Sequence, residues 1–134
     1  MANRPSVGRP LSPHLTIWRW GPHMAVSILH RVTGNALAFG VVVLFAWWLL
    51  AVAGGREAYA LFASVAFGPL GYLVGIGSTW AMFQHMGTGV RHLVMDTGAG
   101  YDLATARKSS LATVAFSLTM TVLVWGYILF VKGA

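Results

Sequence analysis

Apolar residues run through this chain in three long blocks separated by short polar stretches. The blocks extend approximately over Met24–Ala53, Ala58–Met95 and Leu111–Val131. A helix needs about 20 predominantly apolar residues to cross a bilayer, so the pattern predicts three transmembrane helices. The first two blocks exceed that length, which predicts helix tilt or extension beyond the hydrocarbon layer.

Short connections join the three blocks. One runs over 53–57 and the other over 96–109. Short loops make successive helices antiparallel, so we expect an all-α membrane protein with three helices in an up-down-up order. The pair Gly68–Pro69 lies near the start of the second block, where a membrane helix can tolerate it. We divide the chain into an N-terminal segment, 1–23, and a three-helix transmembrane domain, 24–134.

Composition excludes an ordinary soluble domain. Hydrophobic residues make up 57% of the chain and charged residues 9%, whereas soluble domains carry about 25% charged residues. The chain has no cysteine, which excludes disulfides, thiolate metal sites and cysteine-held iron–sulfur clusters within it. The first residues lack the apolar core of a signal peptide, so we expect them to belong to the mature protein.

The net charge of +6 is distributed unevenly along the chain. Seven of the nine Lys and Arg residues fall before or at the start of the first block, or around the second connection: Arg4, Arg9, Arg19, Arg31, Arg91, Arg107 and Lys108. Only Arg56 and Lys132 fall on the other side. Because basic residues favour the cytoplasmic side of a membrane, the N-terminus and second connection should lie there, or in the matrix of a mitochondrion.

Ionisable residues occur inside the apolar blocks, where they are costly and therefore candidates for function. One cluster is Ser27, His30 and Arg31, in the segment SILHRVTG. The other, in HMGTGVRHLVMD, contains His85, Arg91, His92 and Asp96. Antiparallel helices would bring the two clusters together. At 1.5 Å per residue, His92 should lie about 5 Å and His85 about 15 Å from the cytoplasmic end.

His85 belongs to a face of small and polar residues spaced by three or four positions: Gly71, Gly75, Ser78, Met82, His85, Gly89 and His92. Such a face suits packing on protein or cofactor in place of lipid. Gly87 and Gly89 would leave room for a porphyrin beside His85. The hydroxyls of the third helix, at Ser110, Thr113, Ser117 and Thr121, should bond to backbone or bridge helices.

Two interpretations of His85 are open from the residues alone. It either ligates a haem iron or is a packed histidine that donates to a neighbouring carbonyl. Zinc is disfavoured because cysteine is absent and no carboxylate lies nearby. Arg91 and His92 either reach the interface as amphipathic side chains or bind haem propionates, which are natural bidentate partners for arginine.

Ser27 and Arg31 are four residues apart and should face the same side of their helix. They are either a helix-end hydroxyl with a snorkelling arginine, or the polar end of a quinone pocket. His30 has a near-neutral reference pKa and could assist with protons or propionates. His14 and His23 precede the first block and are expected to be interfacial or interaction residues.

Three segments resemble the cytochrome b membrane-anchor subunit of succinate dehydrogenase. They are RPLSPHL at 9–15, SILHRVTG at 27–34 and HMGTGVRHLVMDTG at 85–98. The family's first pattern is met by Arg9, Pro10, Ser27, His30, Arg31 and Thr33. Its second pattern is met by His85, Gly89, Arg91, His92, Asp96 and Gly98. The resemblance spans nearly the whole chain.

This resemblance implies roles for individual residues. His85 would supply one axial ligand to haem b, and a histidine of a second small anchor subunit would supply the other. Ser27 and Arg31 match positions that line the ubiquinone site. His30 and Arg31 match positions near the haem propionates. The segment at 9–15 would face the iron–sulfur subunit.

The implied complex has four subunits, in which a flavoprotein oxidises succinate and an iron–sulfur protein passes electrons to quinone beside the two anchors. We expect a multi-pass protein of a bacterial inner membrane, because a long N-terminal extension is absent. The alternatives are the anchor of a quinol:fumarate reductase, working in the reverse direction, or a haem-free membrane adaptor. A small transporter is disfavoured because three helices lack an inverted repeat.

Overall fold

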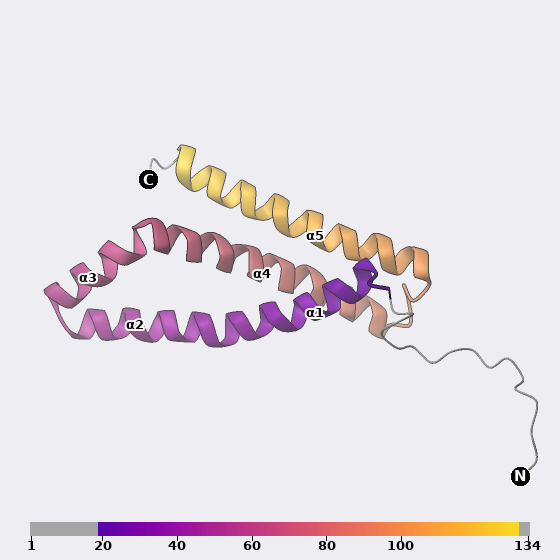
Figure 1. Cartoon of the computed structure of the whole chain (residues 1–134), viewed down its shortest axis with the longest axis horizontal. Coiled ribbons are helices and arrows are strands. Elements are labelled where there is room, and N and C mark those ends of the chain that lie inside the picture. Colours follow the sequence, from indigo (N-terminus) through magenta and orange to yellow (C-terminus); the bar gives the residue numbers. More distant parts are fainter. Residues whose placement is uncertain (1–18, 132–134) are drawn as a thin grey trace, which may run out of the picture.

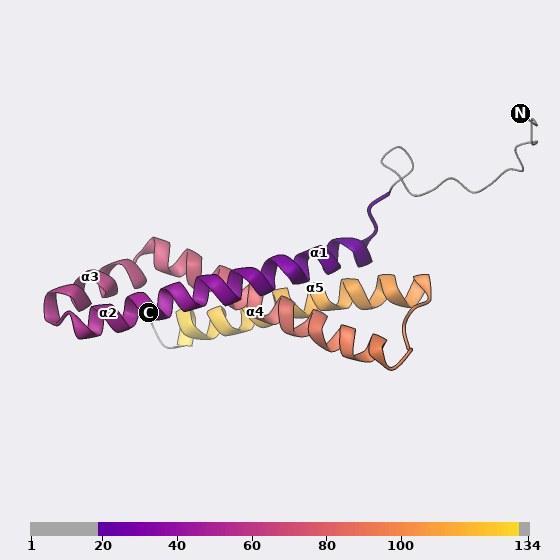
Figure 2. The same ribbon diagram turned by 90° about the horizontal axis from the view of Figure 1, so that it is seen from below.

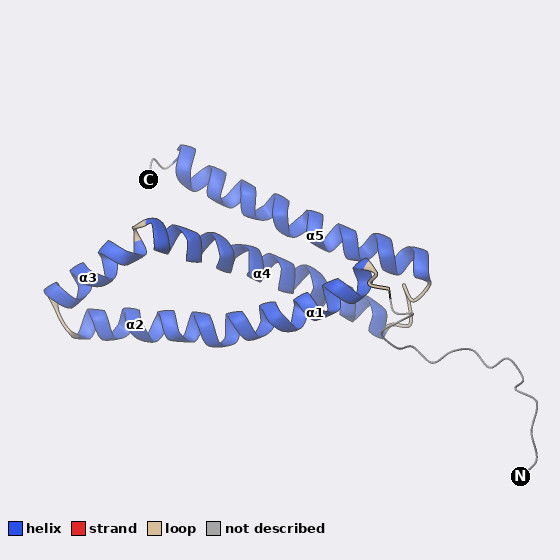
Figure 3. Ribbon diagram, in the orientation of Figure 1, coloured by secondary structure: helices blue, strands red, loops and turns tan. Residues whose placement is uncertain are grey.

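The computed structural model describes residues 19–131, and within that range every regular element is helical (Figure 3). The first long helix runs over Pro22–Ala53. It consists of α1 (Pro22–Asn35), a π-helical stretch η1 (Ala36–Val41) and α2 (Val42–Ala53). The chain then forms α3 (Arg56–Ala66), α4 (Pro69–Asp96), α5 (Leu103–Gly126) and a closing π-helical stretch η2 (Tyr127–Val131).

The helices form an antiparallel arrangement (Figure 1). α1 and α2 lead away from the N-terminal end, α3 and α4 return towards it, and α5 leads away again. The turned view in Figure 2 shows the first helix crossing close to α4. Within the described residues, α4 contacts both α1 and α5, and α1 and α5 also contact each other.

Length and apolarity qualify two helices as membrane spans, Pro22–Ala53 and Leu103–Val131. α3 and α4 pass the same test only together, as a pair bent by 67°. α4 alone is less apolar than the two spans because it carries Gln84, His85, Arg91 and His92. The expected up-down-up order is thus matched in outline, with two spans or three according to whether the bent pair counts as one.

The second predicted helix, 58–95, differs most from the structure. It is broken at Gly68–Pro69, where α3 ends and Pro69 occupies the first turn of α4. Proline lacks an N–H and has a fixed φ, so it suits a helix start better than a helix interior. We expected one continuous helix to tolerate Gly68–Pro69. Instead, the chain bends at these two residues.

The third helix also begins earlier than predicted, at Leu103 and not Leu111. Asp102 caps it, since its side chain accepts a hydrogen bond from the Thr105 N–H at 3.0 Å. This bonding to Thr105 lowers the pKa of the Asp102 carboxyl below its ordinary value. Gly98 and Gly100, both with positive φ, make the turn before it, a conformation that favours glycine.

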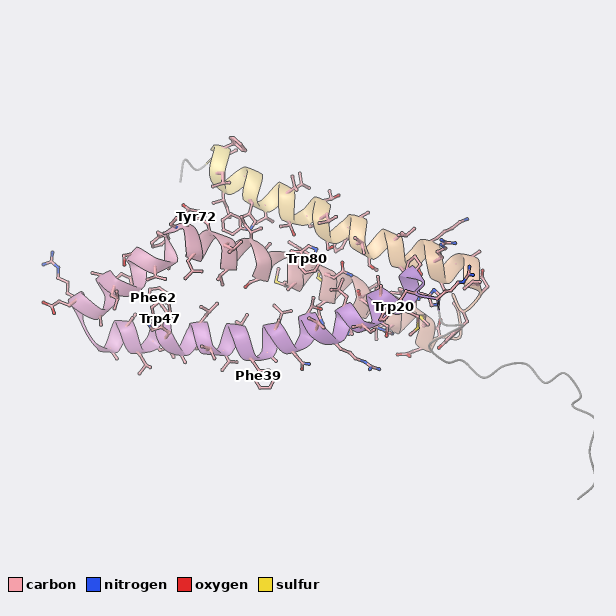
Figure 4. The ribbon with its side chains drawn as sticks, in the orientation of Figure 1. Trp20, Phe39, Trp47, Phe62, Tyr72 and Trp80 are labelled. Atoms are coloured by element: carbon pink, nitrogen blue, oxygen red, sulfur yellow. The ribbon has the colours of Figure 1, made fainter. Side chains whose placement is uncertain are left out.

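Few large apolar side chains are buried among residues 19–131 of the isolated chain. The buried apolar residues are Val26, Ala51, Ala81 and Ala106, whereas large side chains such as Phe39 and Phe130 are exposed. Figure 4 shows Phe39 pointing away from the other helices. Small and polar residues at helix contacts, with large apolar residues outside, are typical of proteins embedded in lipid or among partner helices.

Candidate functional site

Three histidines from two helices meet near the end of α4. His30 of α1 stacks on His85 of α4, with ring centroids 3.9 Å apart and planes 8° apart. The ring of His92, two turns further along α4, lies 5.1 Å from that of His30 and is tilted by 54°. The sequence clusters that antiparallel packing was expected to join are therefore in contact, with His30 between the other two histidines.

The hydrogen bonds of His85 determine which nitrogen is available to a metal. Its Nδ1 lies 3.1 Å from the backbone carbonyl oxygen of His30 and 3.4 Å from Thr33 Oγ1. A carbonyl only accepts, so the contact with His30 is a hydrogen bond when Nδ1 carries the proton. The neutral ring then has its lone pair on Nε2, which is the tautomer that a metal-ligating histidine with an Nδ1 partner adopts.

Gly34 leaves the space that this ring occupies. A Cβ at position 34 would lie 2.8 Å from His85 Cε1 and 3.3 Å from its Nδ1. The glycine is required here by the close approach of α4. Gly89 is less confined, because the nearest atom to an added Cβ is His30 Cε1, at 3.9 Å.

Gly87 does not lie on the histidine side of α4. A Cβ on it would lie 3.2 Å from Phe116 and 3.6 Å from Thr113, both on α5. Successive residues on a helix point about 100° apart, so Gly87, two residues after His85, points to the other side of α4. The expectation that Gly87 makes room for a porphyrin is therefore wrong.

The histidine cluster fits a haem better than a bare metal ion. Among residues 19–131 no group of three His, Cys, Asp or Glu side chains is arranged to hold a metal ion. A haem can be held through a single histidine nitrogen, and Nε2 is the nitrogen of His85 left for that role when Nδ1 donates to the His30 carbonyl. Among residues 19–131 the buried Nδ1 of His30 has no hydrogen-bond partner, so it can still bond to a further polar group.

The other predicted site residues lie around this cluster at different exposures. Ser27 is half-buried and Arg31 is exposed on α1. Arg91 is buried and points towards α5, where its Nε donates to Ser109 Oγ at 3.0 Å. The structure thus brings His30, His85 and His92 together, but leaves Arg31 on the outside of α1 and places Arg91 against another helix.

The sequence predicted a role for Arg91 but not for the rest of the buried face of α4 on which it lies. Ala81, Gln84, Thr88 and Arg91 follow steps of three and four and are the buried residues of α4. They face α5, whose buried residues are Ala106, Ser110, Thr113, Ser117 and Thr121. The sequence feature that indicates this face is Gln84, an uncharged amide within an apolar block, directly before His85.

The hydroxyls of α5 behave as predicted. Ser110, Thr113 and Thr121 donate to backbone carbonyls of their own helix, at 2.7–2.8 Å. Ser117 also bridges helices, because its Oγ lies 2.7 Å from Gln84 Oε1. These contacts hold α4 against α5, and the histidines occupy a different side of α4, the one that meets α1.

A separate cavity of about 320 Å³ lies at the other end of the molecule, between α2 and the bent pair α3–α4. Its walls are almost wholly apolar, and Trp47 meets Phe62 beside it with ring centroids 4.9 Å apart (Figure 4). Neither Ser27 nor Arg31 lines it. This cavity is therefore distinct from the histidine cluster.

Known proteins match this chain over most of its length. The family model described as succinate dehydrogenase/fumarate reductase transmembrane subunit matches residues 5–124. The succinate dehydrogenase cytochrome b556 subunit of Paracoccus denitrificans is 41% identical over 123 residues, which cover 92% of this chain and 94% of the relative.

Two further relatives carry the same kind of name. The cytochrome b556 subunit of Rickettsia felis is 37% identical over 117 residues, 87% of this chain and 90% of that protein. The mitochondrial cytochrome b560 subunit of Sus scrofa is 38% identical over 116 residues, 85% of this chain and 68% of that protein. This chain belongs to the succinate dehydrogenase/fumarate reductase transmembrane subunit family.

Proposed function

We propose that this chain is the membrane-anchoring haem b subunit of a succinate:ubiquinone oxidoreductase. The observation that carries the proposal is His85, whose Nδ1 is held by the His30 carbonyl so that Nε2 can ligate iron. The similar proteins are named cytochrome b subunits of succinate dehydrogenase. Those names favour succinate dehydrogenase over a fumarate reductase and favour a haem protein over a haem-free adaptor.

The haem, when bound, supplies a one-electron relay within the membrane. His85 would ligate its iron, and a histidine of a second anchor subunit would be the other ligand. His30 lies between His85 and His92, and His30 and His92 would be the propionate partners on this side of α4. For Arg31 and Arg91 that role requires side-chain movement, because Arg31 is exposed and Arg91 bonds Ser109.

Ser27 and Arg31 would form one wall of the ubiquinone site. Arg31 is exposed in the isolated chain, so the rest of the pocket must come from partner subunits. Its permanent charge would stabilise negative charge that develops on a quinone oxygen, while the Ser27 hydroxyl would donate to a carbonyl. A flavoprotein and an iron–sulfur subunit would supply the electrons.

The membrane arrangement follows from charge and from the helices. α1–α2, the bent pair α3–α4 and α5 would cross a bacterial inner membrane as three spans, making 24–134 the transmembrane domain. The end that carries Arg91 and Arg107 would be cytoplasmic. The segment 1–23 would lie on that side; its part before residue 19, with His14 and the 9–15 motif, falls outside the described residues.

The experiment compares two activities of the assembled complex. In Arg31→Leu, succinate reduction of ubiquinone should fall about tenfold or more, as when a charge-stabilising group is removed. Succinate reduction of a soluble dye should be unchanged, because the succinate site lies in another subunit. Equal loss of both activities would contradict a local quinone role. A wild-type complex without a b-type haem spectrum would contradict the haem role of this chain.

A further inference from the structure

Gln84 is a fully buried amide directly before His85 in α4. Its exposed fraction is 0%, as are those of Thr88 and Ser117, the two residues that it bonds. In a membrane helix a buried amide is costly unless its polar atoms are paired. The position therefore calls for an explanation beyond packing, since Leu would fill similar space without a polar group.

The hydroxyl protons fix how this amide is oriented. Thr88 Oγ1 uses its one proton on the Gln84 backbone oxygen, at 2.8 Å, so it must accept the 3.1 Å bond from Gln84 Nε2. Gln84 Oε1 consequently faces Ser117, whose Oγ donates to it at 2.7 Å and has the Val114 backbone oxygen as a second acceptor at 2.9 Å. The side chain is held at both ends, and one of those ends is on α5.

The direction of Gln84 is linked to that of His85. Adjacent residues on an α-helix point about 100° apart around its axis. Gln84 points to α5, where it bonds Ser117, and His85 points to α1, where it bonds the His30 carbonyl. Any rotation of α4 that turned His85 would also pull Gln84 away from Ser117.

Few side-chain hydrogen bonds link α4 to α5 among residues 19–131. They are Gln84 with Ser117, Arg91 with Ser109, and Thr79 with Trp125. The Gln84 bond is the one adjacent to the candidate ligand. The other buried hydroxyls of α5, such as Thr121, bond only to their own helix.

We propose that Gln84 and Ser117 are positioning residues that set the rotation of α4 and thereby the imidazole plane of His85. The proposal rests on the proposed role of His85 as haem ligand. Ligating groups need to be held within about 0.5 Å and 10–20° of their working geometry. The carbonyl of His30 holds the ring from one side, and the Gln84–Ser117 bond holds the helix that bears it from the other.

The test uses the purified four-subunit complex with bound haem, and it compares Gln84→Leu and Ser117→Ala with two controls. Ser117→Thr keeps the hydroxyl, and Thr121→Val removes a buried hydroxyl of the same interface that bonds only within α5. The readout is the largest g value of the oxidised low-spin haem by electron paramagnetic resonance, which depends on the angle between the two axial ring planes.

We expect Gln84→Leu and Ser117→Ala to shift that g value, or to lose haem, while Ser117→Thr and Thr121→Val keep the wild-type signal. An unshifted signal at full haem content in the first two variants would overturn the proposal. An equal effect in Thr121→Val would overturn it too, since loose packing would then suffice. The proposed function is tested separately. A normal haem spectrum in His85→Ala would contradict the role of His85 as haem ligand, whatever the Gln84 and Ser117 variants show.

Discussion

The imidazole ring of His30 lies flat on that of His85, with centroids 3.9 Å apart and planes 8° apart. The same two residues are joined again by the hydrogen bond from His85 Nδ1 to the His30 carbonyl oxygen. His30 thus contacts both the face of the His85 ring, by stacking, and its edge, by the hydrogen bond to Nδ1. The orientation of His85 therefore depends on how closely α1 approaches α4.

The space at Gly34 provides a first prediction. In Gly34→Ala the new methyl would lie 2.8 Å from His85 Cε1, so the ring or the helix must move. Overpacking of this kind costs about 1–3 kcal/mol, and each 1.4 kcal/mol is about a tenfold change in affinity. Haem bound per purified complex, measured by the pyridine haemochrome, should fall.

The matched control is Gly40→Ala on the same long helix, where an added Cβ meets nothing within 4 Å. It should leave haem content unchanged, because alanine is also the better helix former. Equal haem content in both variants would mean that the contact between Gly34 and His85 does not hold the ligand.

Gly75 tests the far end of the α4–α5 contact. In Gly75→Ala the methyl would lie 2.8 Å from Trp125 Cζ2, and the bond from Trp125 Nε1 to Thr79 would be disturbed. We expect a loss of about 1–3 kcal/mol in unfolding free energy in detergent, by circular dichroism. The haem spectrum should be retained, because His85 lies ten residues, about 15 Å, further along the helix.

Gly77→Ala is the control for that variant, since an added Cβ there meets nothing within 4 Å. It should be as stable as the parent. Loss of haem in Gly75→Ala without loss of stability would contradict the separation of the two ends of α4.

The absence of cysteine makes the membrane orientation easy to measure. Arg56→Cys lies at the start of α3 and Arg107→Cys lies in the first turns of α5, and both positions are exposed. In intact spheroplasts a membrane-impermeant maleimide should label the first variant, and the second only after permeabilisation. The opposite pattern would reverse the proposed topology.

The sequence predicted the meeting of the two histidine clusters because that follows from helix direction and depth alone. Antiparallel helices of known rise place SILHRVTG beside the end of the second block, and the structure joins His30 to both His85 and His92. The ring stack itself could not be predicted. It depends on the close approach at Gly34, which is a property of two helices and not of either one.

Other features were missed because hydropathy averages over them. Gly68 and Pro69 are only two residues within a long apolar block, so they hardly change its average hydropathy. The block is therefore predicted as one continuous helix, although the two helices α3 and α4 meet there at a bend of 67°. Gln84 was overlooked because one amide barely changes an apolar average. Its importance comes from Ser117, 33 residues away in the chain, which the interface places within 2.7 Å.

The central claim is that His85 ligates a haem, and the direct measurement is the dithionite-reduced minus oxidised optical spectrum of the purified complex carrying His85→Ala. The control is His23→Ala, at the start of α1, which should keep the b-type band at wild-type intensity. The account predicts that the band is lost in His85→Ala while the four subunits still copurify. A b-type band of normal position and intensity in that variant would contradict it.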